Sequence, residues 1–196
     1  MVLNELFGYL SGIVILLSFF PYLRDILAKK TKPERASWFI WTVLGTIITF
    51  SQLYKGASYS LIVSAAQVVG DFFIFILALK YGIGGFLKRD IFALCGATIA
   101  LIFWYFTKEA ATALFIGIFI DATGTFLTTI KSYEKPETET VSSWLLTFVA
   151  GFLGCLSVGS LNLILLAFPI YVCLASISII SAIYFGLKRK IIYGTR

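Results

Sequence analysis

Two aspartates stand out because each lies near the middle of a long apolar stretch of the chain. Asp71 lies within residues 58–79 and Asp121 within residues 110–130, and neither stretch holds a lysine or arginine. A charged carboxylate in the centre of a bilayer costs about 2.5–3.5 kcal/mol or more. Such a group therefore contacts water, binds a cation, hydrogen-bonds hydroxyl groups or holds a proton. The pair predicts a transport path or a proton relay, and the alternative is a neutral aspartate that only links helices.

Further polar and aromatic residues share the helix faces of these aspartates. Gln67 precedes Asp71 by four residues, which is one helical turn, and Thr125 follows Asp121 by the same interval. Trp41 lies one turn inside its own apolar stretch, where its indole could cap a solute by stacking or could pack in the core. We expect these groups to line a wet central cavity.

The residue types that support most enzyme chemistry are scarce. The chain has no histidine, which removes the usual general base and the commonest metal ligand. Its three cysteines lie in apolar runs and have neither a metal-ligand spacing nor a disulfide framework. The sequence therefore predicts no enzyme, no metal site and no cofactor.

The composition predicts that the helices carrying these residues lie in a lipid membrane. Of 196 residues, 59% are apolar and 13% are charged, against roughly 45–50% and about 25% in soluble domains. A helix needs about 20 mostly apolar residues to cross a bilayer. Cutting the chain at charges and turn residues predicts an all-α polytopic membrane protein with seven transmembrane helices, at residues 6–26, 37–54, 58–79, 91–106, 110–130, 141–158 and 161–187.

The basic residues predict the orientation of these helices. Of the 16 lysines and arginines, 14 lie in the links after the first, third and fifth segments and in the C-terminal tail. By the positive-inside rule the N-terminus is outside and the C-terminus is cytoplasmic, which places the chain in the cytoplasmic (plasma) membrane. Topology and attraction to anionic lipid account for the net charge of +6, so we expect no nucleic acid as a partner.

A weak internal repeat divides the seven segments. Residues 21–38 and 124–144 both place a Lys-Pro-Glu twelve positions after a helix-breaking residue, and both then reach a Ser-Trp that opens the next helix. The chain therefore parses into a first triple-helix unit at 1–86, a linker helix at 87–108 and a second triple-helix unit at 109–196. This is a 3+1+3 parallel repeat, for which a monomer is feasible and a homo-oligomer stays open.

Two residues of the repeat favour helix bending. Pro21 lacks a backbone N–H and clashes with the preceding turn, so the first helix is expected to kink there. Gly124 gives the fifth helix a soft point at the matching position. We predict hinges at both residues, and a tolerated kink without motion is the alternative.

Trp38 and Trp144 open the second and sixth predicted helices. Indole rings favour the interface between lipid and water. We therefore expect both tryptophans to belong to an aromatic belt at the membrane surface.

These features together resemble a family of transporters. The proline near the end of the first helix, the lysine-rich link and the second triple-helix unit are similar to SWEET and PQ-loop transporters, including the half-size SemiSWEETs. Residues 67–73, Gln-Val-Val-Gly-Asp-Phe-Phe, resemble the Asn-Val-Val-x-x-Phe-Phe stretch of the SemiSWEETs, in which the asparagine contacts substrate. The resemblance implies that Gln67 is a substrate ligand, and it aligns Thr49 with a tryptophan of the family's second helix.

The sequence therefore predicts a small secondary transporter or facilitator in the lipid bilayer. We expect it to move a small polar metabolite, such as a sugar, an amino acid or a vitamin-like solute, by alternating access. Proton coupling through Asp71 and Asp121 is a further expectation, because a buried carboxyl group can load and release a proton. The competing hypothesis is a non-transporting membrane protein, such as a sensor, a lipid-handling protein or an assembly partner.

Overall fold

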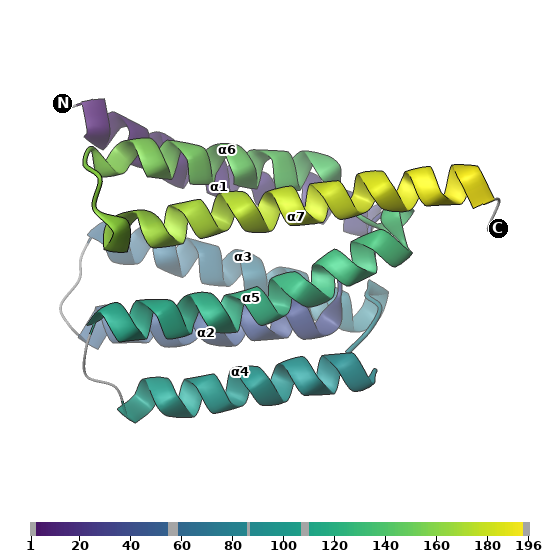
Figure 1. Ribbon diagram of the computed structural model, residues 1–196, viewed down its shortest axis with the longest axis horizontal. Coiled ribbons are helices and arrows are strands. Elements are labelled where there is room, and N and C mark those ends of the chain that lie inside the picture. The colour runs from purple at the N-terminus through teal and green to yellow at the C-terminus, as the bar shows by residue number, and fades with distance from the viewer. Residues whose placement is uncertain (1–2, 55–58, 86, 107–109, 194–196) are drawn as a thin grey trace. The chain divides into compact units, whose positions relative to one another are not determined.

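The computed structural model describes residues 3–54, 59–85, 87–106 and 110–193. Within these ranges, the side chains at 48–54, 59–66, 100, 101, 103, 104, 110, 111, 113 and 164 lie outside the description. The described chain is all-α, as expected, with seven α-helices and one short 3-10 helix (Figure 1). They are α1 (Leu3–Leu27), α2 (Arg35–Tyr54), α3 (Tyr59–Tyr81), α4 (Lys88–Phe106), α5 (Ala110–Glu134), η1 (Pro136–Thr138), α6 (Val141–Val158) and α7 (Leu163–Tyr193).

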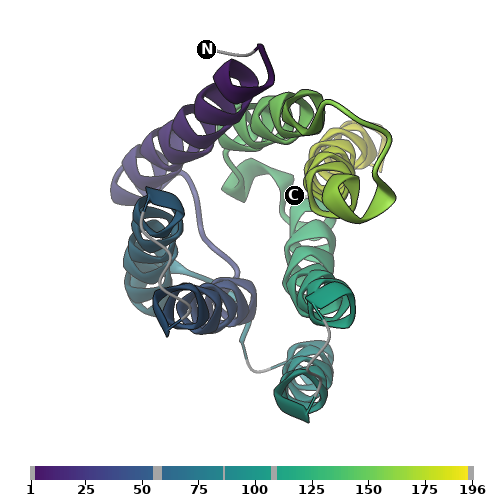
Figure 2. The same cartoon turned by 90° about the vertical axis from the view of Figure 1, so that its left-hand side faces the viewer.

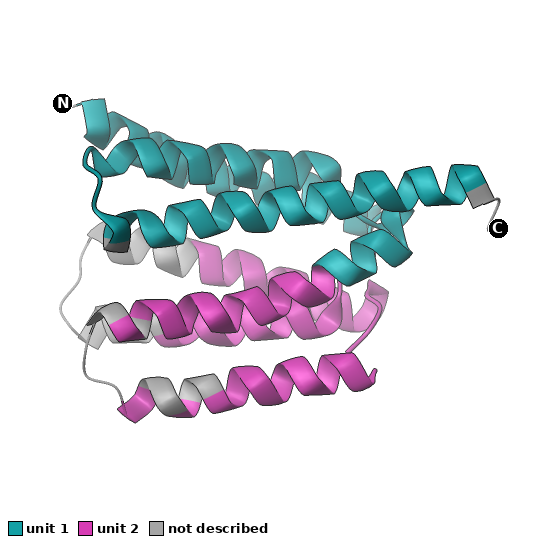
Figure 3. Cartoon of the chain, in the orientation of Figure 1, with its two compact units in different colours: residues 1–31, 129–196 teal, residues 32–128 magenta. Residues whose placement is uncertain are grey.

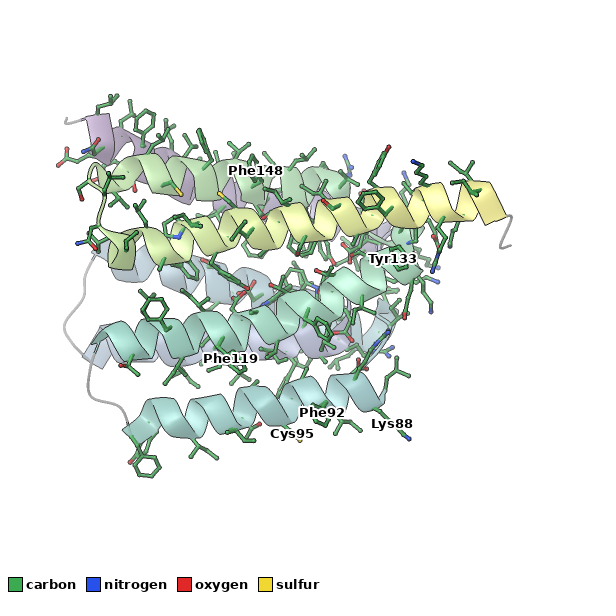
Figure 4. All side chains as sticks on the ribbon, viewed as in Figure 1. Lys88, Phe92, Cys95, Phe119, Tyr133 and Phe148 are labelled. Atoms are coloured by element: carbon green, nitrogen blue, oxygen red, sulfur yellow. The ribbon has the colours of Figure 1, made fainter. Side chains whose placement is uncertain are left out.

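Within the part of the chain that the structure describes, four stretches of helix are long and apolar enough to cross a membrane. They are Leu3–Leu27, Leu114–Glu134, Val141–Val158 and Leu165–Ile192. Large apolar side chains cover much of their surface, as they do on α4, where Phe92 and Cys95 are both exposed (Figure 4). Soluble proteins rarely expose so much contiguous apolar surface, because water disfavours it. The four helices suggest an integral multi-pass membrane protein.

The helices form two compact units, coloured separately in Figure 3. Unit 1 comprises Met1–Thr31 and Thr129–Arg196, and unit 2 comprises Lys32–Thr128, so the division falls inside α5. These boundaries differ from those of the predicted repeat. Unit 1 combines α1 with α6 and α7, whereas unit 2 combines α2, α3 and α4 with most of α5.

Unit 1 is built on α6, which packs against both α1 and α7. The end-on view of Figure 2 shows α6 between these two helices. Hydroxyl groups tie α1 to α6: Ser11 Oγ donates to Ala150 O at 2.8 Å, and Ser143 Oγ donates to Ser18 O at 2.6 Å. The short helix η1 packs against α7 and closes the link between α5 and α6.

Unit 2 is built on α2, which packs against α3 and α4. Its apolar core joins three helices, with Ile40 and Leu44 from α2, Ala97 from α4, and Ile120 and Leu127 from α5. In a lipid environment such side chains hold helices together by close van der Waals packing. This core fixes α5 beside α2 and therefore sets the position of the polar side chains that both helices carry.

Candidate functional site

Unit 2 brings together four of the predicted site residues, which we call the polar centre: Trp41 of α2, Asp71 of α3, and Asp121 and Thr125 of α5. Thr125 Oγ1 lies 3.5 Å from Asp121 Oδ2, which it approaches from one turn along α5. Trp41 Nε1 donates to the main-chain oxygen of Asp121 at 3.2 Å. The Asp71 and Asp121 carboxyl groups are close enough for their charges to interact. Their spacing in the sequence predicts that these residues share helix faces, and packing within unit 2 brings those faces of α2, α3 and α5 together.

Asp71 is the most enclosed group of the polar centre. Its side chain is only 7% exposed, and it makes no hydrogen bond with any residue that the structure describes. Helix α2 passes close to it at Gly45, where a Cβ atom would lie 3.8 Å from Asp71 Oδ2. Asp71 is thus an enclosed carboxyl group whose charge interacts with that of Asp121.

Trp41 reaches α5 because Gly124 has no side chain. A Cβ atom at Gly124 would lie 2.7 Å from Trp41 Nε1, which is closer than real Cβ contacts allow. On its other side the indole packs edge-on against Trp38, with ring centroids 5.0 Å apart. Gly124 thus permits a close approach between helices, while its predicted role as a hinge stays a prediction.

The other predicted site residues lie in different settings. Gln67 is half-buried on α3, one turn before Asp71. The side chain of Thr49 lies outside the described residues. Pro21 lies inside α1 and belongs to unit 1, so unit 2 holds the whole polar centre without it.

A second polar group in unit 2, at the start of α2, was not anticipated from the sequence. Pro33 and Glu34 run parallel to Ile83, with Ile83 N donating to Pro33 O at 2.9 Å. This pairing holds Glu34 just before the helix, where its Oε2 accepts from Ser37 N at 2.6 Å. The geometry is that of an N-cap, in which a side chain satisfies a free N–H of the first turn. The Glu-x-x-Ser spacing is the only sequence signal for it.

The Ser37 hydroxyl has more neighbours than one proton can serve. It lies 2.9 Å from Glu34 Oε2 and 2.7 Å from Gly124 O, and it accepts from Thr128 Oγ1 at 2.8 Å. The Glu34 carboxyl oxygen and the Gly124 carbonyl oxygen both lie where the Ser37 hydroxyl can donate, and the hydroxyl has one proton for the two acceptors.

The Glu34 carboxyl group is deeply enclosed. The residue is 2% exposed, and its Oε1 has no partner among the described residues. Gly84 lies directly against it in a left-handed conformation, with φ of 76°, and a Cβ there would collide with the carboxyl group. Burial raises the pKa of Glu34, and the charge of nearby Asp90 raises it further, while the hydrogen bonds from Ser37 lower it without reversing the shift.

Unit 1 holds a buried ion pair whose lysine, Lys131, was counted from the sequence among the basic residues of the link after the fifth segment. Lys131 Nζ lies 2.5 Å from Glu139 Oε1, with side chains 2% and 0% exposed. Glu139 also accepts from Tyr22 Oη at 3.2 Å and from Trp144 Nε1 at 2.9 Å. Lys131 donates further to Thr138 O at 2.8 Å. Because α5 continues to Glu134, Lys131 lies inside the helix, and the η1 turn carries Glu139 back to it.

The end of α7 is held by exposed charges in the same unit. The Arg189 guanidinium lies 4.4 Å from the centre of the Tyr133 ring, which is labelled at the end of α5 in Figure 4. Lys190 Nζ pairs with Glu137 Oε2 at 2.6 Å. Slight burial works to raise the pKa of Glu137, but the hydrogen bond and charge of Lys190 outweigh it and lower the pKa.

The polar centre combines groups that can bind a polar solute. The described residues contain no group of three or more His, Cys, Asp or Glu side chains that could hold a metal ion. Two carboxyl groups, a hydroxyl group and an indole can bind a polar solute or exchange a proton. No protein family, no curated protein and no solved structure matches this chain.

Proposed function

We propose that this chain is a small secondary transporter or facilitator that moves a small polar solute across the cytoplasmic membrane by alternating access. The observation that carries the proposal is the polar centre, because Asp71, Asp121, Thr125 and Trp41 converge within one unit of an otherwise apolar helical protein. Ionisable groups inside membrane helices are expensive and serve solute or proton pathways in most cases.

The proposal includes seven spans with the N-terminus outside and the C-terminus in the cytoplasm. Four apolar helices and the bias of 14 in 16 basic residues toward one side support this topology. The spans would comprise two triple-helix units and α4 as the linker. Asp71 and Asp121 would contact the solute, and their protonation would couple transport to the pH gradient.

Matching contacts support the parallel repeat. In unit 1, Ser143 at the start of α6 donates to Ser18 O on α1. In unit 2, Ser37 at the start of α2 donates to Gly124 O on α5. Both serines directly precede a tryptophan. In unit 1, α1 precedes the first Lys-Pro-Glu and lies beside α6, which follows the second. In unit 2, α5 precedes the second Lys-Pro-Glu and lies beside α2, which follows the first. Duplicated triple-helix units are common in secondary transporters.

Uptake into liposomes tests the proposal. The purified protein is screened by thermal shift against glucose, amino acids and nicotinamide riboside, and the compound that stabilises it is then supplied in radiolabelled form. We expect saturable uptake that changes when a pH gradient is imposed. The Asp71→Asn, Asp121→Asn double variant should lose the saturable uptake and its response to the pH gradient. Glu5→Gln, which changes an exposed carboxyl group at the start of α1, should retain both properties.

The competing hypothesis gives the opposite result. If the aspartates only link helices in a sensor or assembly partner, a stabilising ligand is bound but is not carried into the liposome lumen. Uptake equal to that of protein-free liposomes would reject the transporter proposal. Identical fluxes with and without the pH gradient would reject proton coupling alone.

A further inference from the structure

The Ser37 hydroxyl group lies between two acceptors that belong to different parts of unit 2. Its Oγ is 2.9 Å from Glu34 Oε2, just before α2, and 2.7 Å from the main-chain oxygen of Gly124 on α5. Thr128 Oγ1 donates to the same Ser37 oxygen at 2.8 Å, so the Thr128 proton does not satisfy either acceptor. The contact between α2 and α5 therefore admits two hydrogen-bond arrangements, according to which acceptor receives the Ser37 proton.

A proton on Glu34 selects between these arrangements. Without it, both Glu34 oxygens only accept, and the carboxylate attracts the Ser37 proton more strongly than a neutral carbonyl does. With a proton on Oε2, the carboxyl group donates to Ser37 Oγ, and the Ser37 proton turns to Gly124 O. The hydrogen bonds then run in one direction, from Glu34 through Ser37 to α5.

Glu34 is enclosed in a way that favours the protonated form. Its side chain is 2% exposed, and Oε1 is buried without a partner among the described residues. Gly84 lies so close to Oε1 that a Cβ atom there would collide with it. An unpaired oxygen costs less in a neutral carboxyl group than in a carboxylate, because the charged form loses more hydration on burial. Burial accordingly raises the pKa of Glu34.

The charged groups beside Glu34 reinforce this preference or are engaged elsewhere. Asp90, at the start of α4, raises the pKa of Glu34 further through its negative charge, and Arg89 Nε lies 3.7 Å from Asp90 Oδ1. Arg35 follows Glu34 in the chain, but its guanidinium donates to two main-chain oxygens at 3.0 and 3.1 Å. Helix α5 presents a main-chain oxygen and the Thr128 hydroxyl to this cluster, and neither carries a charge.

The acceptor on α5 belongs to the same residue that admits Trp41. A Cβ atom at Gly124 would lie 2.7 Å from Trp41 Nε1, and this indole donates to Asp121 O at 3.2 Å. A change of the hydrogen bond at Gly124 O therefore acts on the contact between α2 and α5 beside the polar centre.

We propose that Glu34 is a proton-binding site whose occupancy sets whether the Ser37 hydroxyl ties α2 to α5 at Gly124. The proton comes from the solvent and binds to Glu34 Oε2, and it returns to the solvent as the pH rises. The inference does not require transport. The proposed topology adds only that the proton comes from the cytoplasm.

Two signals recorded on the full-length protein in detergent test the proposal. Infrared difference spectra follow the carbonyl stretch of protonated carboxyl groups, and the Glu34 band is the one lost in Glu34→Gln. Fluorine NMR of protein labelled with fluorotryptophan follows Trp41, whose resonance is the one lost in Trp41→Phe. We expect the Glu34 band to disappear as the pH rises through a midpoint above 4.5, and the Trp41 resonance to shift with the same midpoint.

Variants separate the switch from a buried acid that acts on nothing. In Glu34→Gln the Trp41 resonance should lose this shift, because the amide stays neutral and donates to Ser37 at every pH. Ser37→Ala should raise the midpoint of the Glu34 band, since the hydroxyl bond that lowers the pKa is lost, and should abolish the Trp41 shift. Glu137→Gln, which removes a partly exposed carboxyl group, should leave both signals as in the wild type.

Three outcomes overturn the proposal. They are a wild-type Trp41 resonance that stays fixed through the Glu34 midpoint, an equal Trp41 shift in Ser37→Ala, and the absence of a Glu34 band above pH 4.5. The Trp41 titration of the wild type alone must show a midpoint above 4.5, so the proposal stays testable where a variant at Glu34 or Ser37 fails to fold.

Discussion

The buried carboxyl groups of this protein differ in what satisfies them. Glu139 accepts hydrogen bonds from the Lys131 ammonium group, the Tyr22 hydroxyl and the Trp144 indole N–H, so its charge is balanced within the protein. Glu34 receives only the main chain and hydroxyl of Ser37 and leaves one oxygen unpaired. Asp71 has no hydrogen bond among the described residues. The ion pair with Lys131 makes Glu139 a structural group.

The first prediction concerns Glu34 and pH. Its pKa in the folded protein is raised above the ordinary value of 4.5, with burial as the largest cause. The contribution of Glu34 to stability is therefore fully present below pH 4.5 and is lost as the pH rises through the raised folded value. Glu34→Gln stays neutral and can donate to Ser37, so it should avoid this loss. We expect the Tm of the wild type to fall relative to Glu34→Gln between pH 4 and 8, by a few °C.

Glu137→Gln is the matched control for that titration. The pKa of Glu137 is lowered by Lys190, so its contribution to stability is present above pH 4.5 and is lost as the pH falls. The Tm difference between wild type and Glu137→Gln should therefore have the opposite sign of pH dependence and a smaller size, because the pair is exposed. Parallel curves for wild type and Glu34→Gln would contradict a raised pKa of Glu34 in the folded protein.

At the scale of the elements, the link from α5 to α6 depends on one buried ion pair. Lys131→Met removes the cation and leaves Glu139 enclosed with its charge unmatched, which costs about 3–5 kcal/mol in comparable sites. We predict a large fall in Tm for Lys131→Met and partial recovery when Glu139→Gln is added. Thermal unfolding of both variants in detergent measures the coupling.

Lys190→Met provides the comparison, since it removes the same charge from the exposed pair with Glu137. Its side chains are 31% and 54% exposed, and exposed pairs contribute about 0–1 kcal/mol. The change in Tm should therefore be small. Equal changes for Lys131→Met and Lys190→Met would mean that the buried pair is not a stabilising contact of the folded protein.

The sequence predicted the helices more reliably than the contacts between their side chains. The length of the apolar runs between charged and turn residues was sufficient for seven helices, and one-turn spacing placed Thr125 with Asp121. Trp38 and Trp144 were expected at the lipid interface, but they are 5% and 8% exposed because each packs inside its unit. Lys131 was counted as a link residue, since its partner Glu139 follows a turn whose course no local pattern specifies. Pairings across a turn or between distant helices depend on packing, which sequence spacing alone does not encode.

At the scale of the whole molecule, each compact unit combines helices from the first four of the chain with helices from the last three. Unit 1 combines α1 with α6 and α7, and unit 2 combines α2, α3 and α4 with most of α5. The core of unit 2 consequently joins Ile40 of α2 to Ile120 of α5, some 80 residues away in sequence. Neither unit is completed by the first four helices or by the last three alone.

Because each unit combines helices from both halves of the chain, we predict that two fragments of the chain associate when they are expressed separately. When residues 1–106 and 107–196 are co-expressed as separate polypeptides with a tag on the first, we expect the second to co-purify with it, because each unit would otherwise expose faces that pack only on the other fragment. Ile40→Ala, which opens the shared core, should weaken recovery of the second fragment, at a cost of about 2–5 kcal/mol. Phe92→Ala, on the exposed side of α4, should not. Fragments that purify apart, or equal recovery with both variants, would show that α5 does not depend on α2 for its place in unit 2.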